Sequence, residues 1–155
     1  MPDLAAVHAQ LLELVGTSGA EISGRADRRD FARFAVACGE EVPADVAPPL
    51  FLPSIIEWGA GPPLHELRED GTGADRDAFL PLDGLRLMGG GQDLELLEDV
   101  AHGTEFTARP TLEDAMLREG RSGPLLFIRV RTEFRATDGR LLLTSRETMI
   151  ARDAA

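Results

Sequence analysis

The sequence has no lysine, no tyrosine and a single cysteine. Because Cys38 stands alone, an intrachain disulfide is excluded and nothing points to an oxidising compartment. No apolar run approaches the ~18 residues that a membrane-spanning helix needs. The N-terminus also lacks the basic stretch ahead of an apolar one that marks a signal peptide. We therefore expect a cytoplasmic protein without a membrane partner.

Positive charge is scarce as well. The chain carries 27 acidic and 16 basic residues, a net charge of −11. This balance argues against nucleic acid or an anionic membrane surface as the main partner. With 155 residues, 43% of them hydrophobic, the chain is long enough for one domain with a sizeable core, which we expect to span residues 1–155.

The first helix is predicted over residues 2–16, inside an N-terminal extension of residues 1–20. Its apolar side chains recur at helical spacing: Leu4, Val7, Leu11, Leu14 and Val15. Pro2 suits a first turn, and Gly16 can close the helix.

A second helix is predicted over residues 27–38. Its apolar residues stand at i, i+3, i+4 and i+7 and share one helical face: Phe31, Phe34, Ala35 and Cys38. Asp27 is the expected N-cap, and Gly39 the residue that ends the helix. Since Cys38 lies on the apolar face, we expect it to be buried rather than nucleophilic.

The middle of the chain is rich in proline. A short helix over residues 53–58 fits this region, because proline is tolerated in a first turn and Gly59 follows. Residues 66–83 are polar, contain glycine and lack periodicity, which indicates a flap-like surface loop. A loop of this length in a compact domain is usually functional or disordered.

From Leu85 onward the apolar period changes to two. Two strands are predicted over residues 104–109 and 112–118, on either side of Pro110. The clearest strand covers residues 125–136, and Asp138-Gly139 indicates a hairpin into a partner strand over residues 141–150. Helices followed by an antiparallel meander predict an α+β domain with a helix packed on one sheet face.

Two stretches resemble ligand-binding motifs but lack residues that those motifs require. Gly89-Gly90-Gly91 is not a phosphate cradle, because no Lys-Ser/Thr pair follows it and nearby carboxylates would repel phosphate, so it indicates a turn or bulge. His65-Glu66 opens like a zinc-protease motif, but glutamate stands where the second histidine belongs. The remaining histidines are isolated in sequence, so we expect no metal site.

The polar cluster that remains is an acidic turn after the second helix. Glu40 and Asp45 could act as general acid or base if burial raised their pKa values; otherwise the turn is a solvated surface feature. Trp58 and His65 flank the proline-rich stretch, where a pocket could open. A single tryptophan serves either as a core anchor or as a ligand platform.

Several stretches together resemble MaoC-like dehydratases, in particular the N-terminal half of 3-methylfumaryl-CoA hydratase-like acyl-thioester hydratases and dehydratases. They are residues 30–39, the turn through Pro43, Ala47-Pro48-Pro49 before Leu50-Phe51, residues 79–88, residues 119–127 and Asp138-Gly139. The similarity spans most of residues 21–152. It implies the hot-dog fold, a curved antiparallel sheet wrapped around a central helix, with residues 27–38 as that helix.

The resemblance also implies a reaction: water is added to, or removed from, the double bond next to a thioester. Catalytic halves of the family carry Gly-Asp-x-Asn-Pro-x-His after the helix, and residues 39–45 align with it. Glu40 replaces the aspartate, Val42 the asparagine and Asp45 the histidine. An imidazole titrates near neutrality, whereas a carboxylate there would need a large pKa rise. We therefore expect a non-catalytic subunit of a hydro-lyase.

The partners implied are an acyl-CoA or acyl-ACP thioester and a second MaoC-like hot-dog subunit that supplies the catalytic pair, with no cofactor. Substrate contacts are expected from Phe51, Trp58, Gly89 and Gly90. Two alternatives stay open: a homodimer that binds an acyl thioester without turnover, and a self-sufficient hydratase or thioesterase. The latter would require a histidine beside Glu40 in a closed cavity.

Overall fold

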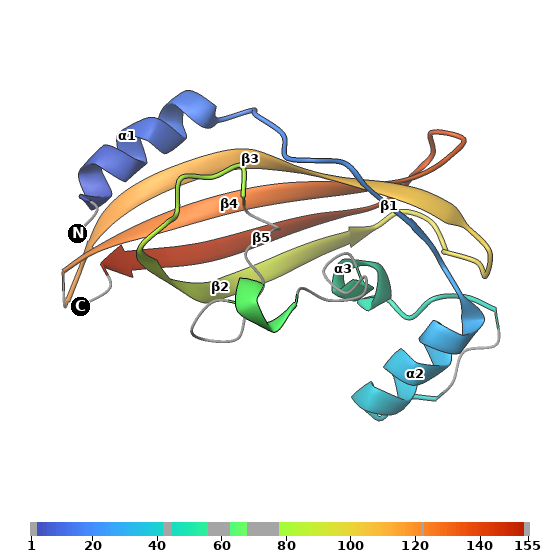
Figure 1. The fold of residues 1–155 in the computed structure, drawn as a ribbon. Helices are drawn as coiled ribbons and strands as arrows, with labels where there is room; N and C mark the ends of the chain where they lie inside the picture. The colour runs from blue at the N-terminus through green and yellow to red at the C-terminus, as the bar shows by residue number, and fades with distance from the viewer. Residues whose placement is uncertain (1–2, 42–44, 56–62, 68–77, 122, 154–155) are drawn as a thin grey trace.

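The computed structural model describes residues 3–41, 45–55, 63–67, 78–121 and 123–153. In chain order the elements are α1 (Leu4–Leu14), β1 (Ile22–Arg25), α2 (Arg28–Cys38), α3 (Phe51–Ile55), the 3-10 helix η1 (Leu64–Glu66), β2 (Leu85–Leu96), β3 (Glu105–Gly120), β4 (Gly123–Ala136) and β5 (Leu141–Asp153). The long strands β2 to β5 follow the helices, as predicted, while the short strand β1 lies between α1 and α2 (Figure 1).

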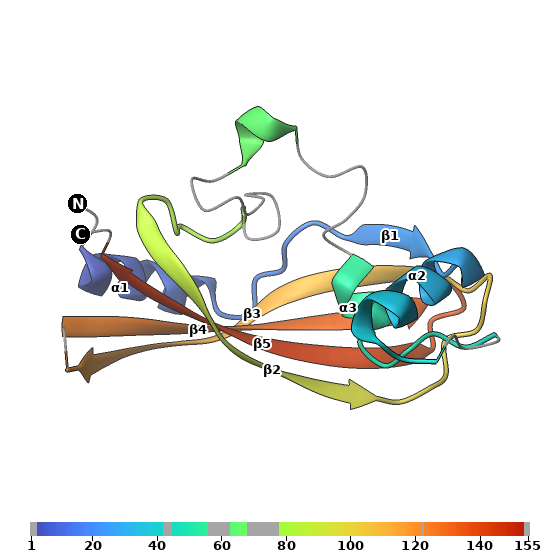
Figure 2. The ribbon, with the colours of Figure 1, turned by 90° about the horizontal axis from the view of Figure 1, so that it is seen from below.

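The strands form one five-stranded antiparallel sheet in the order β1-β3-β4-β5-β2. Three long strands joined by tight turns lie in the middle, and β1 and β2 form the two edges. The sheet curls along its length (Figures 1 and 2).

β3 is one strand where two were predicted. Pro110 lies within it, opposite Thr132 of β4, and a bulge follows between Leu112 and Asp114. The Pro110 carbonyl accepts the Gly19 N–H at 2.9 Å. The N and C=O of one strand residue point to the same side, so the ring nitrogen faces away from β4 and no bond of that ladder is lost.

The hairpin after β4 forms as predicted. Gly139 has φ +91°, and its N–H donates to the Ala136 carbonyl at 2.8 Å. The Asp138 carboxylate accepts the Arg140 N–H at 3.1 Å. These bonds turn the chain into β5 in register with β4.

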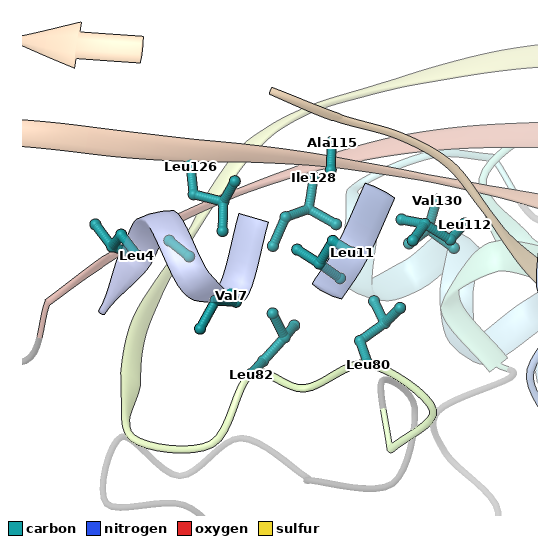
Figure 3. Close-up of a cluster of buried hydrophobic side chains, with 11 residues drawn as sticks. Leu4, Val7, Leu11, Leu80, Leu82, Leu112, Ala115, Leu126, Ile128 and Val130 are labelled. Carbon is teal, nitrogen blue, oxygen red and sulfur yellow. The ribbon is translucent and has the colours of Figure 1, made fainter. Parts of the chain in front are cut away.

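One face of the sheet, here called the inner face, carries two separate apolar clusters. The α1 cluster joins α1 to the middle strands; its buried members are Leu4, Val7, Leu11, Leu80, Leu82, Leu112, Ala115, Leu126, Ile128, Val130 and Ala151 (Figure 3). The α2 cluster lies near the other end; its buried members are Ala26, Phe31, Phe51, Leu52, Val100, Phe106, Ala108, Phe134, Ala136, Leu142 and Leu143. Each cluster is covered by a different helix.

α2 begins and ends as predicted but packs differently. The Asp27 side chain accepts the Arg29 N–H, and Gly39 ends the helix with φ +73°. The prediction that this helix is the central one is wrong: α2 lies at one end of the sheet, and α1 and α3 share the inner face with it (Figures 1 and 2). The prediction of a buried Cys38 is also wrong, since its side chain is exposed.

The middle of the chain is described in part. The helix predicted over residues 53–58 starts earlier, at Phe51, and is described to Ile55; Trp58 lies outside the described residues. Of the predicted flap, residues 68–77 lie outside them as well. No helix in the described ranges has the length and apolar character needed to cross a membrane.

Candidate functional site

The two predicted carboxylates lie at opposite ends of α2. The Glu40 N–H donates to the Ala35 carbonyl at 2.9 Å, at the end of the helix. The Asp45 carboxylate forms an ion pair with Arg28, the first helical residue. α2 has 11 residues, which at ~1.5 Å of rise per residue makes it roughly 16 Å long. Both side chains are exposed, so they do not form an acid–base pair.

The histidines do not complete a catalytic pair with Glu40. His102 Nδ1 accepts the Arg28 N–H at 3.0 Å, and the His102 N–H donates to the Asp45 carbonyl at 2.9 Å. His102 thus lies at the start of α2, away from Glu40. His65 is exposed on η1, which stands apart from α2 in both views (Figures 1 and 2). Among the described residues, no histidine pairs with the Glu40 carboxylate.

Phe51 lies inside the α2 cluster. It is 1% exposed, and its ring meets those of Phe31 and Phe34 edge to face, with centroids 4.8 and 5.9 Å away. Such pairs stabilise beyond the area they bury. The ring therefore anchors α3 to α2.

The glycine run forms a bulge in β2, one of the two structures predicted for it. The register against β5 shifts between Gly89 and Gly91, and Gly91 has φ +126°. A Cβ on Gly90 would lie 3.0 Å from the Thr148 carbonyl oxygen, whereas one on Gly89 would meet nothing within 4 Å. Gly89 therefore borders open space on the sheet.

Four polar side chains meet at the centre of the inner face. Thr132 of β4 stands opposite Ser145 of β5, and Gln92 of β2 stands opposite Glu147 of β5. Ser145 and Glu147 are two residues apart and so share this face. We call Gln92, Thr132, Ser145 and Glu147 the polar quartet.

The quartet separates the two apolar clusters. On one side of it Phe134 pairs with Leu143, in the α2 cluster, and on the other Ile128 pairs with Met149, against the α1 cluster. A band of hydrogen-bonding groups therefore crosses an otherwise apolar surface.

The side chains of the quartet become more exposed from β4 toward β2. Thr132 and Ser145 are 2% and 3% exposed, Glu147 is half-buried and Gln92 is exposed. Gln92 Nε2 donates to Ser145 Oγ at 2.9 Å. The quartet is thus closed toward β4 and open toward the edge strand β2.

The hydropathy pattern does not predict this group. Thr132 was visible as a polar residue on the apolar face of β4. The other three gather around it through the registers of β2 and β5 against β4, which a hydropathy pattern does not contain.

The family described as "FAS1-like, dehydratase domain region" matches residues 14–145 of the chain. The chain belongs to this family. No curated protein matches it.

Solved structures share the fold of this FAS1-like dehydratase domain. A chain of the HadBC (3R-hydroxyacyl-ACP dehydratase) complex from Mycobacterium tuberculosis superposes with a TM-score of 0.67 at 16% identity, over 88% of this chain and 96% of that one. The ChsH1–ChsH2 complex from the same organism gives 0.68 at 13% identity, covering 96% and 90%. A hot-dog-like protein from Thermanaerovibrio acidaminovorans gives 0.57 at 14% identity, covering 93% and 88%. The fold is a hot-dog fold, as predicted.

Within this FAS1-like dehydratase domain, the residues named from sequence do not converge. Glu40, Asp45, Phe51 and the glycine run lie at four separate places. The polar quartet is a group of hydrogen-bonding side chains that the sheet brings together on its inner face, and Gly89 lies near it on β2, opposite Met149.

Proposed function

We propose that this chain is a non-catalytic subunit of a heteromeric enoyl-thioester hydratase or 3-hydroxyacyl-thioester dehydratase. One observation carries the proposal: Glu40 and Asp45 lie at opposite ends of α2, exposed, and no described histidine pairs with Glu40. Water addition needs a positioned base and acid. A second MaoC-like subunit supplies both.

The free edge of β2 supports the need for a partner. β2 pairs with β5 on one side, and no described strand pairs with its other side. Exposed apolar side chains lie along and beside this edge: Met88, Leu96 and Leu97. Unpaired backbone groups next to apolar surface are a template for another strand. Two of the structural neighbours, HadBC and ChsH1–ChsH2, are complexes.

A structural neighbour supports the substrate class that we propose. HadBC, one of the structural neighbours, is a 3R-hydroxyacyl-ACP dehydratase. We propose an acyl-CoA or acyl-ACP thioester for this chain, with the reaction at the double bond next to the thioester. The chain forms part of the acyl-binding wall, and the partner performs the proton transfers.

The test compares three samples: this chain alone, a MaoC-like protein of the same genome that carries the intact aspartate and histidine, also alone, and the two co-purified. Hydration of a crotonyl thioester is followed in each. We expect turnover in the complex and none from this chain alone. In the complex, Glu40→Gln and Asp45→Asn leave kcat unchanged, while replacing the catalytic histidine of the other subunit abolishes it. Full activity from the isolated chain would overturn the proposal.

A homodimer that binds thioesters without turnover is a second candidate, favoured by the order of charges along β2. Arg86 lies near the start of the strand, and Asp93 and Glu95 lie near its end. Antiparallel pairing of two copies would place opposite charges together. Mass measurement of the isolated chain and of the co-purified sample distinguishes the two candidates.

A further inference from the structure

We propose that the polar quartet binds a hydroxyl group on a distal carbon of the acyl chain, beyond the reacting double bond, so that the enzyme selects acyl thioesters with such a hydroxyl over plain alkyl ones. The inference rests on the proposed function and goes beyond it by naming a substrate class. The juxtaposition that carries it is Thr132 against Ser145 and Gln92 against Glu147, at the centre of the inner face.

Covering these polar groups with hydrocarbon costs free energy. A polar group that loses water without gaining a hydrogen bond destabilises the bound state. Thr132 and Ser145 are already buried, and Ser145 Oγ accepts a hydrogen bond from Gln92 Nε2 at 2.9 Å. A plain alkyl chain would also remove water from the exposed Gln92 amide. The quartet therefore disfavours such a chain.

The quartet offers both donors and acceptors of hydrogen bonds. The Glu147 carboxylate accepts hydrogen bonds, the Gln92 amide donates and accepts, and the Ser145 and Thr132 hydroxyls do both. A hydroxyl on the ligand also donates and accepts, so it can bond to any of them. With one carboxylate among three neutral groups, the quartet does not require a cationic ligand.

The quartet is open on the β2 side, where Gln92 is exposed. Gly89 lies further along the inner face of β2, opposite Met149, and a Cβ there would meet nothing within 4 Å. Met149 packs against the α1 cluster. A chain entering along β2 would thus pass an apolar stretch beside Gly89 before it reaches Glu147.

The test uses the co-purified complex and a series of enoyl-CoA thioesters of one chain length. One member is unsubstituted, and the others carry a single hydroxyl at successive distal carbons. We expect kcat/KM for at least one hydroxylated member to exceed that of the unsubstituted one by about tenfold. The double variant Thr132→Val, Ser145→Ala should reduce this ratio to near one.

The matched control is Thr144→Val. Thr144 is also buried, at 4% exposed, but neighbours Ser145 in β5 and so points to the opposite face. It should keep the wild-type preference, as should Thr132→Ser, which retains the hydroxyl. Urea unfolding of each variant verifies that it is folded.

The outcomes separate the two proposals. Equal kcat/KM for all thioesters in the wild-type complex, or an equal loss in Thr144→Val, overturns the quartet's role while the proposed function stands. No turnover of any thioester by the complex overturns both.

Discussion

Arg140 holds a compact charge cluster at the hairpin between β4 and β5. Its Nε donates to Asp138 Oδ2 at 2.8 Å, and its guanidinium also pairs with Glu98. The hydrogen bond from the Arg140 side chain lowers the pKa of Asp138 below the usual 3.8. The same contact raises the pKa of Arg140.

Removing this guanidinium should restore the carboxyl pKa. Carboxyl-carbon NMR of Arg140→Leu should show Asp138 titrating at a higher pH than in the wild type. A lowered folded-state pKa contributes stability that is complete above the unfolded pKa and is lost as pH falls through the folded pKa. The stability difference between wild type and variant should therefore shrink in acid. Arg109→Leu, on β3, is the control; an unmoved Asp138 titration in Arg140→Leu would contradict the assignment.

Residue-level expectations succeeded where local geometry decides. The Asp27 cap and the Gly39 end of α2 depend on a few neighbouring residues, so the sequence contains them. The prediction that Cys38 is buried was wrong because burial depends on which element packs against that part of the helix. Phe31 and Ala35 face the α2 cluster, while Cys38 lies at the last helical residue and is exposed.

The bulge of β2 depends on glycine for two different reasons. At Gly91 the backbone φ of +126° is strained for any L side chain, and at Gly90 a Cβ would press on the Thr148 carbonyl oxygen. Gly89 has neither constraint. The three glycines thus offer matched positions in one strand.

We expect Gly90→Ala and Gly91→Ala each to lower the free energy of unfolding by about 1 kcal/mol or more. Gly89→Ala should change it by less than about 0.5 kcal/mol, since open space surrounds its Cβ. Urea unfolding of the three variants measures the difference. Equal losses at all three positions would show that the bulge is not held by these contacts.

At the level of elements, the strands were easier to predict than their arrangement with the helices. Alternation in β4 and the Asp138-Gly139 turn fixed one hairpin, because both signals are short-range. The polar quartet could not be predicted because it depends on the pairing of β2 with β5, two strands that lie far apart in the sequence. The helix chosen as central was wrong because apolar spacing says which face is buried, not which element covers it.

The whole molecule is held by two apolar clusters joined through one sheet. Leu11 is fully buried in the α1 cluster and Phe51 nearly so in the α2 cluster. The helices that carry them lie near opposite ends of the strands (Figures 1 and 2). The polar quartet lies between the clusters.

Truncations in different clusters should therefore add. Leu11→Ala and Phe51→Ala should each cost about 2–5 kcal/mol, by lost burial and by the cavity left behind. The loss of unfolding free energy in the double variant should equal the sum of the losses in the two single variants to within about 0.5 kcal/mol. Phe31→Ala with Phe51→Ala, whose rings are in contact, is the coupled control. Strong coupling between Leu11 and Phe51 would contradict the separation.

A divided interior also changes how such a domain can be altered. Since the α1 and α2 clusters share strands but no buried side chain, α1 with its contacts could be exchanged for that of a relative without redesigning the far end. Chimeras cut between the clusters should thus retain a folded sheet more often than chimeras cut within either one. For the same reason, buried residues of one cluster can change during evolution without compensating changes in the other cluster.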